Sequence, residues 1–535
     1  MRLTIIGGGP GGYTAAFAAA EKGCEVTLIE NSALGGTCLN RGCIPTKTLL
    51  ESVKVLEQLR CAEEYGICVG STATGDSAGQ IGAARNGGTL NSGTLKGAAL
   101  NRTALLGRKR AVTEKLRAGL EFLLADAGVD VIEGRGTLLG EGRVRVEKDG
   151  TTWSGEDGAE NGAVIFGEKI IIAAGSREAP LRIQGAEYLT GSAQALELER
   201  MPADVCIVGG GVVGMEFAAF YSGAGCRVRI LEALPGILNA EDREMAGLLS
   251  KFLRSRGVEI DTGCRVQSVE WRGAGEIDHV NGADTGIGDN ARIGDNARSG
   301  DGAGEDAEAG TDAAETGFTV RYECGGENRS LKADMVLNAV GRRPVTEGLG
   351  LEECGVCLTS DGYIRVNEYL QTTVPEIYAA GDVTGPPLLA HAAFDRGIAA
   401  AQNALTGDHR KPECKTIPRC IYTHPEFGAA GVTEEEAKEK GIRYRKGYCP
   451  LSANGRALAA GKPEGMVKLI AEAELGQIIG VHILGECAAE LTAAAVCAVE
   501  GEFTCEELAG AVLPHPTIGE ALKEAAADCL KKLSR

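Results

Sequence analysis

The chain has 535 residues, 44% of them hydrophobic and 24% charged, a composition that excludes a peptide, a collagen and a wholly disordered protein. Its length suffices for about three domains of roughly 150 residues each. With 74 acidic against 55 basic residues, the net charge of −19 argues against nucleic acid or an anionic membrane surface as the main partner.

The chain begins with an apolar strand that runs directly into glycines, which is not the pattern of a secretory signal. No apolar run reaches the ~18 residues that a membrane span needs. We therefore expect the reducing cytoplasm as the compartment, where most of the 18 cysteines stay thiols. A disulfide that matters there is expected to be catalytic.

Two stretches share one pattern: a strand, a glycine-rich turn, a helix, and a second strand that ends in an acid. In chain order the elements are a strand at 3–6, a helix at 13–22 and a strand at 26–29, then a strand at 205–208, a helix through Tyr221 and a strand at 228–231. Each stretch is a βαβ unit of about thirty residues, the size of a dinucleotide-binding motif.

Each turn carries the spacing GxGxxG. The glycines at its three positions are Gly7, Gly9 and Gly12 in the first turn and Gly209, Gly211 and Gly214 in the second. The first glycine allows the tight turn, the second lets a pyrophosphate approach the backbone, and the third lets helix and strand pack closely. Glu30 and Glu232 follow each last glycine by 18 residues, where a carboxylate can hold a ribose hydroxyl. Two such motifs predict a flavin and a nicotinamide that exchange a hydride.

Two cysteines, Cys38 and Cys43, lie five residues apart just before a predicted helix with apolar Leu49 and Val53. A short loop can close this pair into a redox disulfide. Cys43 lies nearer the helix start, where the dipole and the N–H groups stabilise a thiolate. A zinc site would need a second pair of Cys or His, and none stands nearby. The CxxC at 354–357 also lacks a second half-site, and we interpret it as incidental.

The run Cys-Leu-Asn-Arg-Gly-Cys-Ile-Pro-Thr-Lys at 38–47 closely resembles the flavoprotein disulfide reductases, and most of all the dihydrolipoyl dehydrogenases. The resemblance covers nearly the whole chain. It implies that Cys38 is the interchange thiol and Cys43 the charge-transfer thiol beside the isoalloxazine. It further implies that Lys47 is a partner of flavin N5 and pairs with Glu216.

The motif His515-Pro-Thr-Ile-Gly-Glu520 places a carboxylate at the right interval to orient an imidazole across a turn. A thiol substrate needs a base near its pKa, and a carboxylate-paired histidine supplies one. His424-Pro425 lacks such an acid, and we expect no role for it. In the resembled family the equivalent of this pair comes from the other subunit, so the active site would be complete only in a homodimer.

Three further segments resemble family marks: the strand and turn at 172–176, the return strand at 338–344, and the second flavin motif at 378–383. The residues expected around FAD are Gly7, Gly9, Gly12, Glu30, Gly36, Thr37, Lys47, Ala174, Gly175, Ser176, Gly381 and Asp382, the last of which would bind the ribityl chain. The residues expected around NAD are Gly209, Gly211, Gly214, Glu232 and Gly341.

Glu232 also bears on the choice between the two nicotinamide nucleotides. A carboxylate at this strand end accepts hydrogen bonds from a ribose 2′-hydroxyl and repels a 2′-phosphate. Glutathione-type relatives have arginines just beyond this point, whereas this chain continues Ala-Leu-Pro-Gly at 233–236. The sequence therefore predicts NAD over NADP.

We expect an α/β fold with two Rossmann-like dinucleotide-binding domains, for FAD and NAD, and a C-terminal α+β dimerisation domain. The expected boundaries are 1–200 for the first part of the FAD domain, 201–334 for the NAD domain, 335–411 for the second part of the FAD domain and 412–535 for dimerisation. In the last part, alternating strands at 466–470 and 478–483 accompany helices at 433–440 and 487–500.

Polar segments at 71–104, 154–162 and 272–317 are expected to be insertions. The last contains a tandem Ile-Gly-Asp-Asn-Ala-Arg repeat and holds 11 acidic against 3 basic residues. It cannot bury enough apolar surface to fold alone, so we expect a disordered insertion in a surface hairpin. A partner-binding role for it stays open.

The resemblance implies oxidation of protein-bound dihydrolipoamide through a Cys38–Cys43 disulfide, with hydride transfer to NAD⁺. The partner would be the lipoyl-carrying protein of a 2-oxoacid dehydrogenase complex or of the glycine cleavage system, without nucleic acid or membrane. Two alternatives are a related reductase of another small disulfide and a flavin-binding assembly component that has lost turnover. The intact Cys38, Cys43, His515 and Glu520 argue against the last.

Overall fold

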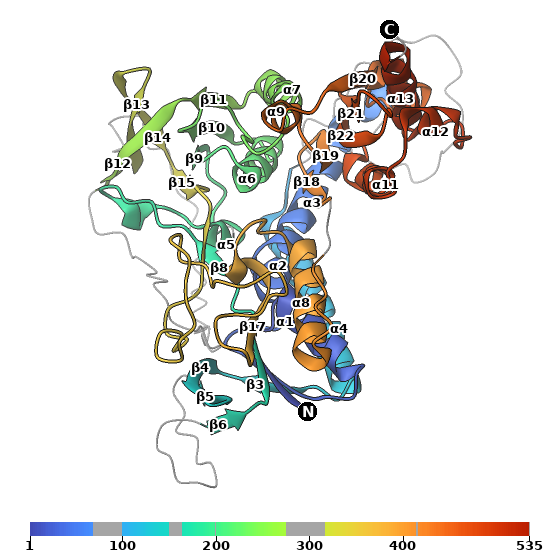
Figure 1. The fold of residues 1–535 in the computed structure, drawn as a ribbon. Helices are drawn as coiled ribbons and strands as arrows, with labels where there is room; N and C mark the ends of the chain where they lie inside the picture. The colour runs from blue at the N-terminus through green and yellow to red at the C-terminus, as the bar shows by residue number, and fades with distance from the viewer. Residues whose placement is uncertain (68–98, 149–162, 198, 274–315, 413–415, 534–535) are drawn as a thin grey trace, which may run out of the picture. The chain divides into compact units, whose positions relative to one another are not determined.

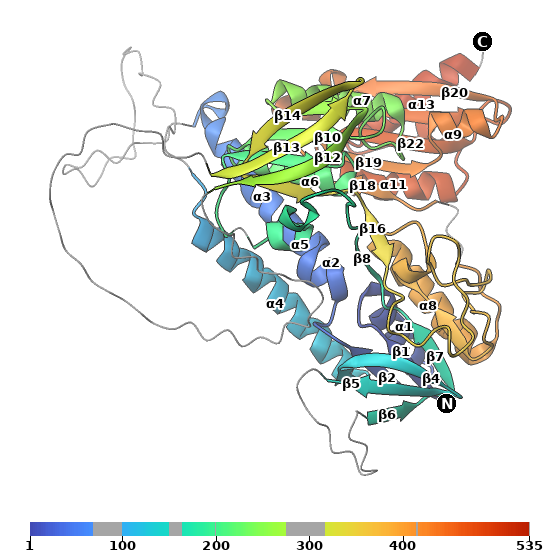
Figure 2. The same ribbon diagram turned by 90° about the vertical axis from the view of Figure 1, so that its left-hand side faces the viewer.

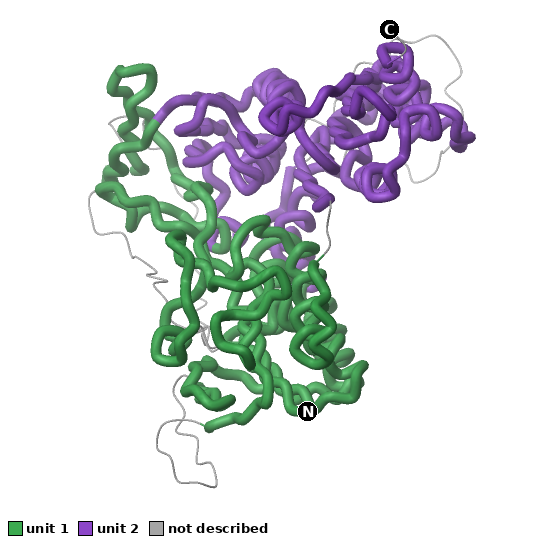
Figure 3. The backbone as a smooth tube through the Cα atoms, in the orientation of Figure 1, with its two compact units in different colours: residues 1–44, 113–193, 265–415 green, residues 45–112, 194–264, 416–535 purple. Residues whose placement is uncertain are grey.

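The computed structural model describes residues 1–67, 99–148, 163–197, 199–273, 316–412 and 416–533. The chain forms two compact units, coloured separately in Figure 3. Unit 1 comprises residues 1–44, 113–193 and 265–415, and unit 2 comprises residues 45–112, 194–264 and 416–535. The insertion predicted at 154–162 and nearly all of those at 71–104 and 272–317 lie outside the described residues.

Unit 1 is built on a five-stranded parallel sheet with the strand order β17-β7-β1-β2-β3. Its strands are β1 (Arg2–Ile6), β2 (Glu25–Glu30), β3 (Asp130–Glu133), β7 (Lys169–Ile172) and β17 (Ile377–Ala379). Successive side chains of a strand point to opposite faces. Leu3 and Ile5 accordingly join one apolar core, and Ile6 joins the other.

Helices α1 (Pro10–Ala20) and α8 (Ala390–Thr406) lie side by side over the Leu3–Ile5 face of this sheet (Figure 1, Figure 2). Small residues allow the close approach: a Cβ at Gly397 would lie 2.2 Å from the carbonyl oxygen of Gly11. The alanine-rich first helix predicted from the sequence is therefore confirmed, and its small side chains serve this helix contact.

The other elements of unit 1 are small antiparallel pairs and short helices. They are α2 (Gly36–Arg41), the meander β4 (Arg135–Gly140), β5 (Arg143–Glu147) and β6 (Ala163–Phe166), the pair β8 (Ser176–Glu178) and β16 (Arg342–Pro344), the hairpin β13 (Gly317–Cys324) and β14 (Glu327–Ala333), strand β15 (Met335–Asn338), and the 3₁₀ turns η2 (Ala186–Tyr188) and η3 (Gly381–Thr384). Elements α3 (Cys43–Arg60), α4 (Arg102–Asp126), α5 (Ser192–Ala195) and β12 (Cys264–Arg272) have residues in both units.

Unit 2 contains the second βαβ motif. Its parallel strands are β9 (Asp204–Val208), β10 (Arg227–Glu232) and β11 (Glu259–Thr262), and its helices are α6 (Val212–Gly223) and α7 (Arg243–Ser255). Helix α3 (Cys43–Arg60) packs closely on α6, since a Cβ at Gly223 would lie 2.1 Å from Val53 Cγ1. Arg60 Nη1 also donates to the Gly223 carbonyl at 3.0 Å.

The C-terminal part of unit 2 is an antiparallel sheet with the order β18-β19-β22-β21-β20. Its elements are β18 (Arg419–Ile421), β19 (Glu426–Gly431), α9 (Glu434–Glu439), β20 (Tyr444–Pro450), α10 (Gly455–Ala459), β21 (Met466–Glu472), β22 (Ile478–Gly485), α11 (Ala488–Glu500), α12 (Cys505–Gly510) and α13 (Glu520–Leu533). The predicted strands and helices of this part are present. No helix in the described ranges is long and apolar enough to cross a bilayer.

A fully buried lysine lies on β21 of this sheet. Lys468 is 0% exposed and its ammonium lies 2.8 Å from Asp242 Oδ2, 2.9 Å from Glu244 and 2.8 Å from Glu434. Asp242 is the N-cap of α7, where its carboxylate accepts the Met245 N–H at 3.2 Å. Burial acts to raise the pKa of Asp242, but the nearby charges of His482 and Lys468 hold it below its usual value.

We expect Lys468→Met to lower the free energy of unfolding by about 3–5 kcal/mol, because a buried Asp242 would lose its counter-ion. Combining it with Asp242→Asn should recover part of the loss. Urea denaturation followed by tryptophan fluorescence measures both. Lys438→Met is the matched control, since Lys438 pairs with the same Glu434 from an exposed position. A loss as large in Lys438→Met would contradict the role of burial.

His482 on β22 gives a pH dependence. Its Nε2 lies 3.0 Å from the Val432 carbonyl, and burial lowers its pKa to about 4. The unfolded state takes up a proton near pH 6.5, the folded state only near pH 4, so stability falls as the pH drops through this window. We expect a loss of ~3 kcal/mol between pH 6.5 and 4 that His482→Gln reduces. The exposed His409→Gln should keep the wild-type profile.

Candidate active site

The two glycine-rich loops have the same backbone geometry, one in each unit. The first glycine of each loop has a left-handed φ, +104° at Gly7 and +110° at Gly209. A Cβ on the third glycine would lie 1.8 Å from the Gly7 carbonyl oxygen at Gly12, and 2.1 Å from that of Gly209 at Gly214. The tight turn and the close helix–strand packing therefore both require glycine, as the sequence predicted.

Neither the tight turn nor the close helix–strand packing requires the second glycine of each loop. Gly9 and Gly211 have ordinary φ values of −74° and −79°. A Cβ on Gly211 would meet nothing within 4 Å, and one on Gly9 would meet only Gly36 Cα at 3.8 Å. The missing side chains thus leave open space at the start of α1 and of α6, where backbone N–H groups can receive a phosphate. Both loops fit a dinucleotide pyrophosphate.

The acids that end β2 and β10 hold these loops in the same way. Glu30 Oε2 accepts the Gly8 N–H at 2.6 Å, and Glu232 Oε2 accepts the Gly210 N–H at 2.5 Å. The other oxygen of each accepts the N–H two residues further on, at 2.8 and 2.7 Å. Burial raises the pKa of Glu30, an effect that these N–H donors partly offset. Each carboxylate keeps further lone pairs for ribose hydroxyls.

Ser176 and Asp382, predicted to contact the flavin, meet in unit 1. Ser176 Oγ donates to Asp382 Oδ2 at 2.5 Å and accepts from Arg342 Nε at 2.7 Å. Arg342 also donates to the Ser176 carbonyl at 2.6 Å. The arginine was part of a predicted motif but was not singled out. It links β16 to the turn that carries Asp382, so it orients the carboxylate predicted to bind the ribityl chain.

The remaining predicted nucleotide contacts lie in turns or at the start of α2. Gly36 adjoins the first loop, since a Cβ on it would lie 2.7 Å from Gly9 Cα. Gly175, Gly381 and Gly341 have φ values of +74°, +76° and +117°, which favour glycine. Thr37 is the second residue of α2, and Ala174 follows β7.

Cys38 and Cys43 lie on two consecutive helices. Cys38 lies inside α2, where the sequence predicted a loop, and Cys43 is the first residue of α3, as the dipole argument requires. Both side chains are half-buried. The pKa of Tyr13 rises to about 12, first through burial and then through the nearby Cys38 and Cys43.

Lys47 and Glu216 meet in unit 2. The Lys47 ammonium lies 2.8 Å from each oxygen of Glu216, whose side chain is only 6% exposed. Lys47 stands one turn after Cys43 on α3, and Glu216 is the fifth residue of α6. The contact of α3 with Gly223 further along α6 brings the two side chains together. The predicted pairing is present.

His515 and Glu520 form the second predicted pair. His515 Nδ1 lies 3.0 Å from Glu520 Oε1, and Glu520 Oε2 accepts the Thr517 N–H at 2.9 Å. The Thr517 N–H and then His515 lower the pKa of Glu520, which stays an acceptor. Nδ1 therefore carries the hydrogen and Nε2 the lone pair. The imidazole is 79% exposed, so this lone pair is accessible.

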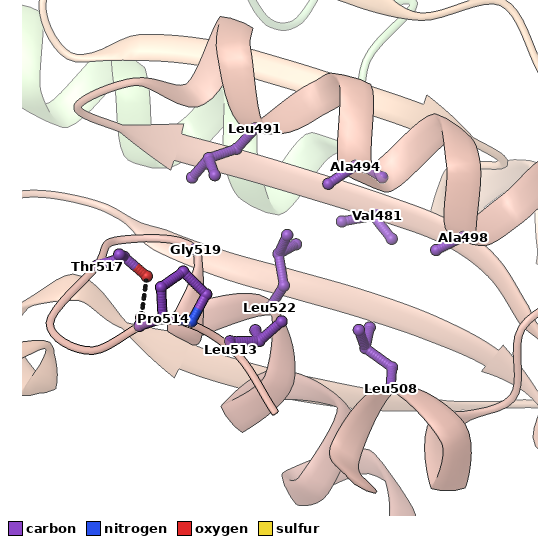
Figure 4. Close-up of a pocket in the computed structure, with 11 residues that line it drawn as sticks. Val481, Leu491, Ala494, Ala498, Leu508, Leu513, Pro514, Thr517, Gly519 and Leu522 are labelled. Carbon is purple, nitrogen blue, oxygen red and sulfur yellow. Dashed lines mark hydrogen bonds between the residues drawn. The ribbon is translucent and has the colours of Figure 1, made fainter. Parts of the chain in front are cut away.

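An apolar pocket of about 330 Å³ lies directly behind the His515 turn (Figure 4). Leu491 and Ala498 of α11, Leu508 of α12 and Leu522 of α13 line it, and the Thr517 hydroxyl donates to the Pro514 carbonyl at its edge. Within the described ranges, no group of three or more His, Cys, Asp or Glu could hold a metal ion.

Residues 1–290 and 305–405 match the pyridine nucleotide-disulphide oxidoreductase family, and residues 417–526 match the dimerisation domain of that family. The chain belongs to this family, as the cysteine run and the two glycine motifs predicted. It is an oxidoreductase of this type, and the family uses FAD and NAD. The α/β class with a C-terminal dimerisation domain is confirmed.

Curated relatives match over nearly the whole chain. A dihydrolipoyl dehydrogenase of Bacillus subtilis is 35% identical over 98% of both chains, and one of Thermus scotoductus is 34% identical over 98% of this chain and 96% of its own. Among solved structures, LpdA from Mycobacterium tuberculosis has a TM-score of 0.76 at 26% identity, covering 98% of this chain and 99% of its own. The HOCl-induced flavoprotein disulfide reductase RclA from Escherichia coli has 0.75 at 25%, with the same coverage.

The matched carboxylates give a test of which loop binds which nucleotide. We expect Glu232→Gln to weaken NADH binding about tenfold or more, since a charged hydrogen bond to ribose is lost, without changing flavin content. Glu30→Gln should lower flavin retention and leave the NADH affinity of the flavin-loaded fraction unchanged. Flavin absorbance and NADH fluorescence titration measure the two effects. The reverse pattern would mean that the two loops are assigned wrongly.

Proposed function

We propose that this protein is an NAD-dependent dihydrolipoyl dehydrogenase. The observation that carries the proposal is the His515–Glu520 hydrogen bond, which leaves Nε2 of an exposed imidazole as a base. A base of this kind serves a substrate that arrives as a thiol. The 35% identity to a dihydrolipoyl dehydrogenase over 98% of the chain supports the same substrate.

In the proposed reaction, His515 Nε2 removes a proton from one thiol of dihydrolipoamide while Glu520 stabilises the imidazolium. The substrate thiolate attacks Cys38 Sγ of the Cys38–Cys43 disulfide, which releases Cys43 as a thiolate. The second substrate thiol then attacks the substrate sulfur of the mixed disulfide, and its proton passes to Cys38 Sγ, which leaves as a thiol. Lipoamide leaves as a disulfide, and both cysteines are reduced by the electron pair that the substrate has lost.

Cys43, Lys47 and Glu232 contribute to the electron transfer that follows through their positions and charges. The first glycine loop, Glu30 and Asp382 would hold FAD, which would supply the hydride chemistry that links the reduced cysteine pair to NAD⁺. Cys43 at the start of α3 has its thiolate stabilised by helix N–H groups. Lys47, held by Glu216, supplies a positive charge beside the proposed isoalloxazine site. Glu232 selects the 2′-hydroxyl of NAD⁺.

We infer that the site is completed in a homodimer, with His515 of one subunit serving Cys38 of the other. The match of residues 417–526 to the dimerisation domain supports this arrangement. The proposed partner is a lipoyl-carrying protein of a 2-oxoacid dehydrogenase complex or of the glycine cleavage system. The compartment that we propose for it is the reducing cytoplasm, where a redox-active Cys38–Cys43 disulfide would be catalytic and not structural.

We expect purified, flavin-loaded protein to form NADH from dihydrolipoamide and NAD⁺, and Cys38→Ser to lower the rate by about 10³-fold or more, since no disulfide can form. NADH absorbance measures the rate. Cys357→Ser is the matched control, because this exposed cysteine belongs to the CxxC interpreted as incidental and should leave the rate unchanged.

Full activity of Cys38→Ser would refute the proposed chemistry. A yellow, dimeric protein without turnover on dihydrolipoamide would instead favour a reductase of another disulfide, the class to which RclA belongs by its description. A panel of small disulfides with NADH and NADPH then separates the candidates. If the protein is a dihydrolipoyl dehydrogenase, His515→Gln should lose activity on the dithiol substrate.

A further inference from the structure

Tyr422 contacts both members of the Lys47–Glu216 pair, although no sequence motif pointed to it. It follows β18 directly and lies in unit 2 with both partners. The Lys47 ammonium stands over its ring, 4.6 Å from the centroid. Its backbone N–H donates to Glu216 Oε1 at 3.1 Å. One residue thus holds the carboxylate through its backbone and the ammonium through its side chain.

The Tyr422 ring contacts Lys47, which is the less constrained member of the Lys47–Glu216 pair. Glu216 is 6% exposed and receives two donors, whereas the Lys47 side chain is 29% exposed on a flexible four-carbon stem. A lysine cation over an aromatic face is attracted by the ring quadrupole and is partly shielded from water. Burial and then nearby acidic groups raise the pKa of Tyr422 to about 12, so the phenol stays neutral at physiological pH.

We propose that Tyr422 is a positioning residue for the flavin, holding the Lys47 ammonium in the one place where it can stabilise negative charge on the reduced cofactor. The proposal rests on the proposed function, which puts Lys47 beside the isoalloxazine. The ring face is the active element. The hydroxyl is not required, because the ammonium lies over the ring and the bond to Glu216 comes from the backbone.

The test measures the oxidation–reduction equilibrium of the bound flavin, which a purely structural role would not move. Holoenzyme variants are prepared in a Cys38→Ser background, so that no disulfide takes up the electron pair. They are equilibrated with mixtures of NAD⁺ and NADH, and the flavin absorbance gives the ratio of oxidised to reduced cofactor. We expect Tyr422→Leu to shift this equilibrium toward the oxidised form by about fivefold, as loss of a cation–π contact implies. For a two-electron couple this is about 20 mV.

Tyr422→Phe is the matched control, since it keeps the ring and the backbone N–H, and it should stay within about twofold of the wild type. Lys47→Met closes a double-mutant cycle. In that background Tyr422→Leu should have no further effect, because the ring has no cation to hold. Flavin content and the thermal midpoint are measured for each variant, so that loss of cofactor or of fold is recognised.

The outcomes separate the two proposals. If Lys47→Met itself leaves the flavin equilibrium unchanged, the position of Lys47 in the proposed function is wrong. If Lys47→Met shifts it and Tyr422→Leu does not, only the role of Tyr422 is overturned. An equal shift from Tyr422→Leu with and without Lys47, or equal shifts from Leu and Phe, would also overturn it.

Discussion

The arrangement of the site depends on one close contact, that of α3 with α6 at Gly223. Only a residue without a side chain can stand there, because a Cβ would lie 2.1 Å from Val53 Cγ1. Helix α3 begins with Cys43, and α6 follows directly from the second glycine loop. Their approach brings Lys47 to Glu216, so a single small residue sets the spacing on which the proposed electron transfer relies.

The nucleotide loops could be predicted from the sequence because everything that determines them is local. Strand, turn, helix and acid lie within about thirty residues, and the same spacing occurs twice. Both occurrences have the same geometry, down to the N–H that Glu30 and Glu232 accept from the middle of each loop. The His515–Glu520 pair, five residues apart, was predictable for the same reason.

The residues that were not predicted from the sequence make contacts with residues far away along the chain. Tyr422 meets Glu216 across 206 residues, and Arg342 meets Ser176 across 166. Lys468 was part of a predicted alternating strand, where a lysine is expected to face water. It is buried because Asp242 and Glu434 come from elements that cover this face of the sheet. In the sequence, the burial of Lys468 is indicated by its position inside an apolar run. This pattern does not indicate which acidic residues the lysine pairs with.

These contacts between residues far apart in the chain show that residues 416–535 have structural roles besides the predicted dimerisation. Lys468 supplies the cation without which the N-cap of α7, Asp242, could not be buried. Tyr422, directly after β18, contacts Glu216 on α6, so the C-terminal part of the chain fixes two points of the second βαβ motif. The pair His515–Glu520 is carried on the helical layer of the C-terminal sheet. A shift of this part of the chain would therefore displace both the His515–Glu520 pair and the Tyr422 contacts that hold Lys47 and Glu216.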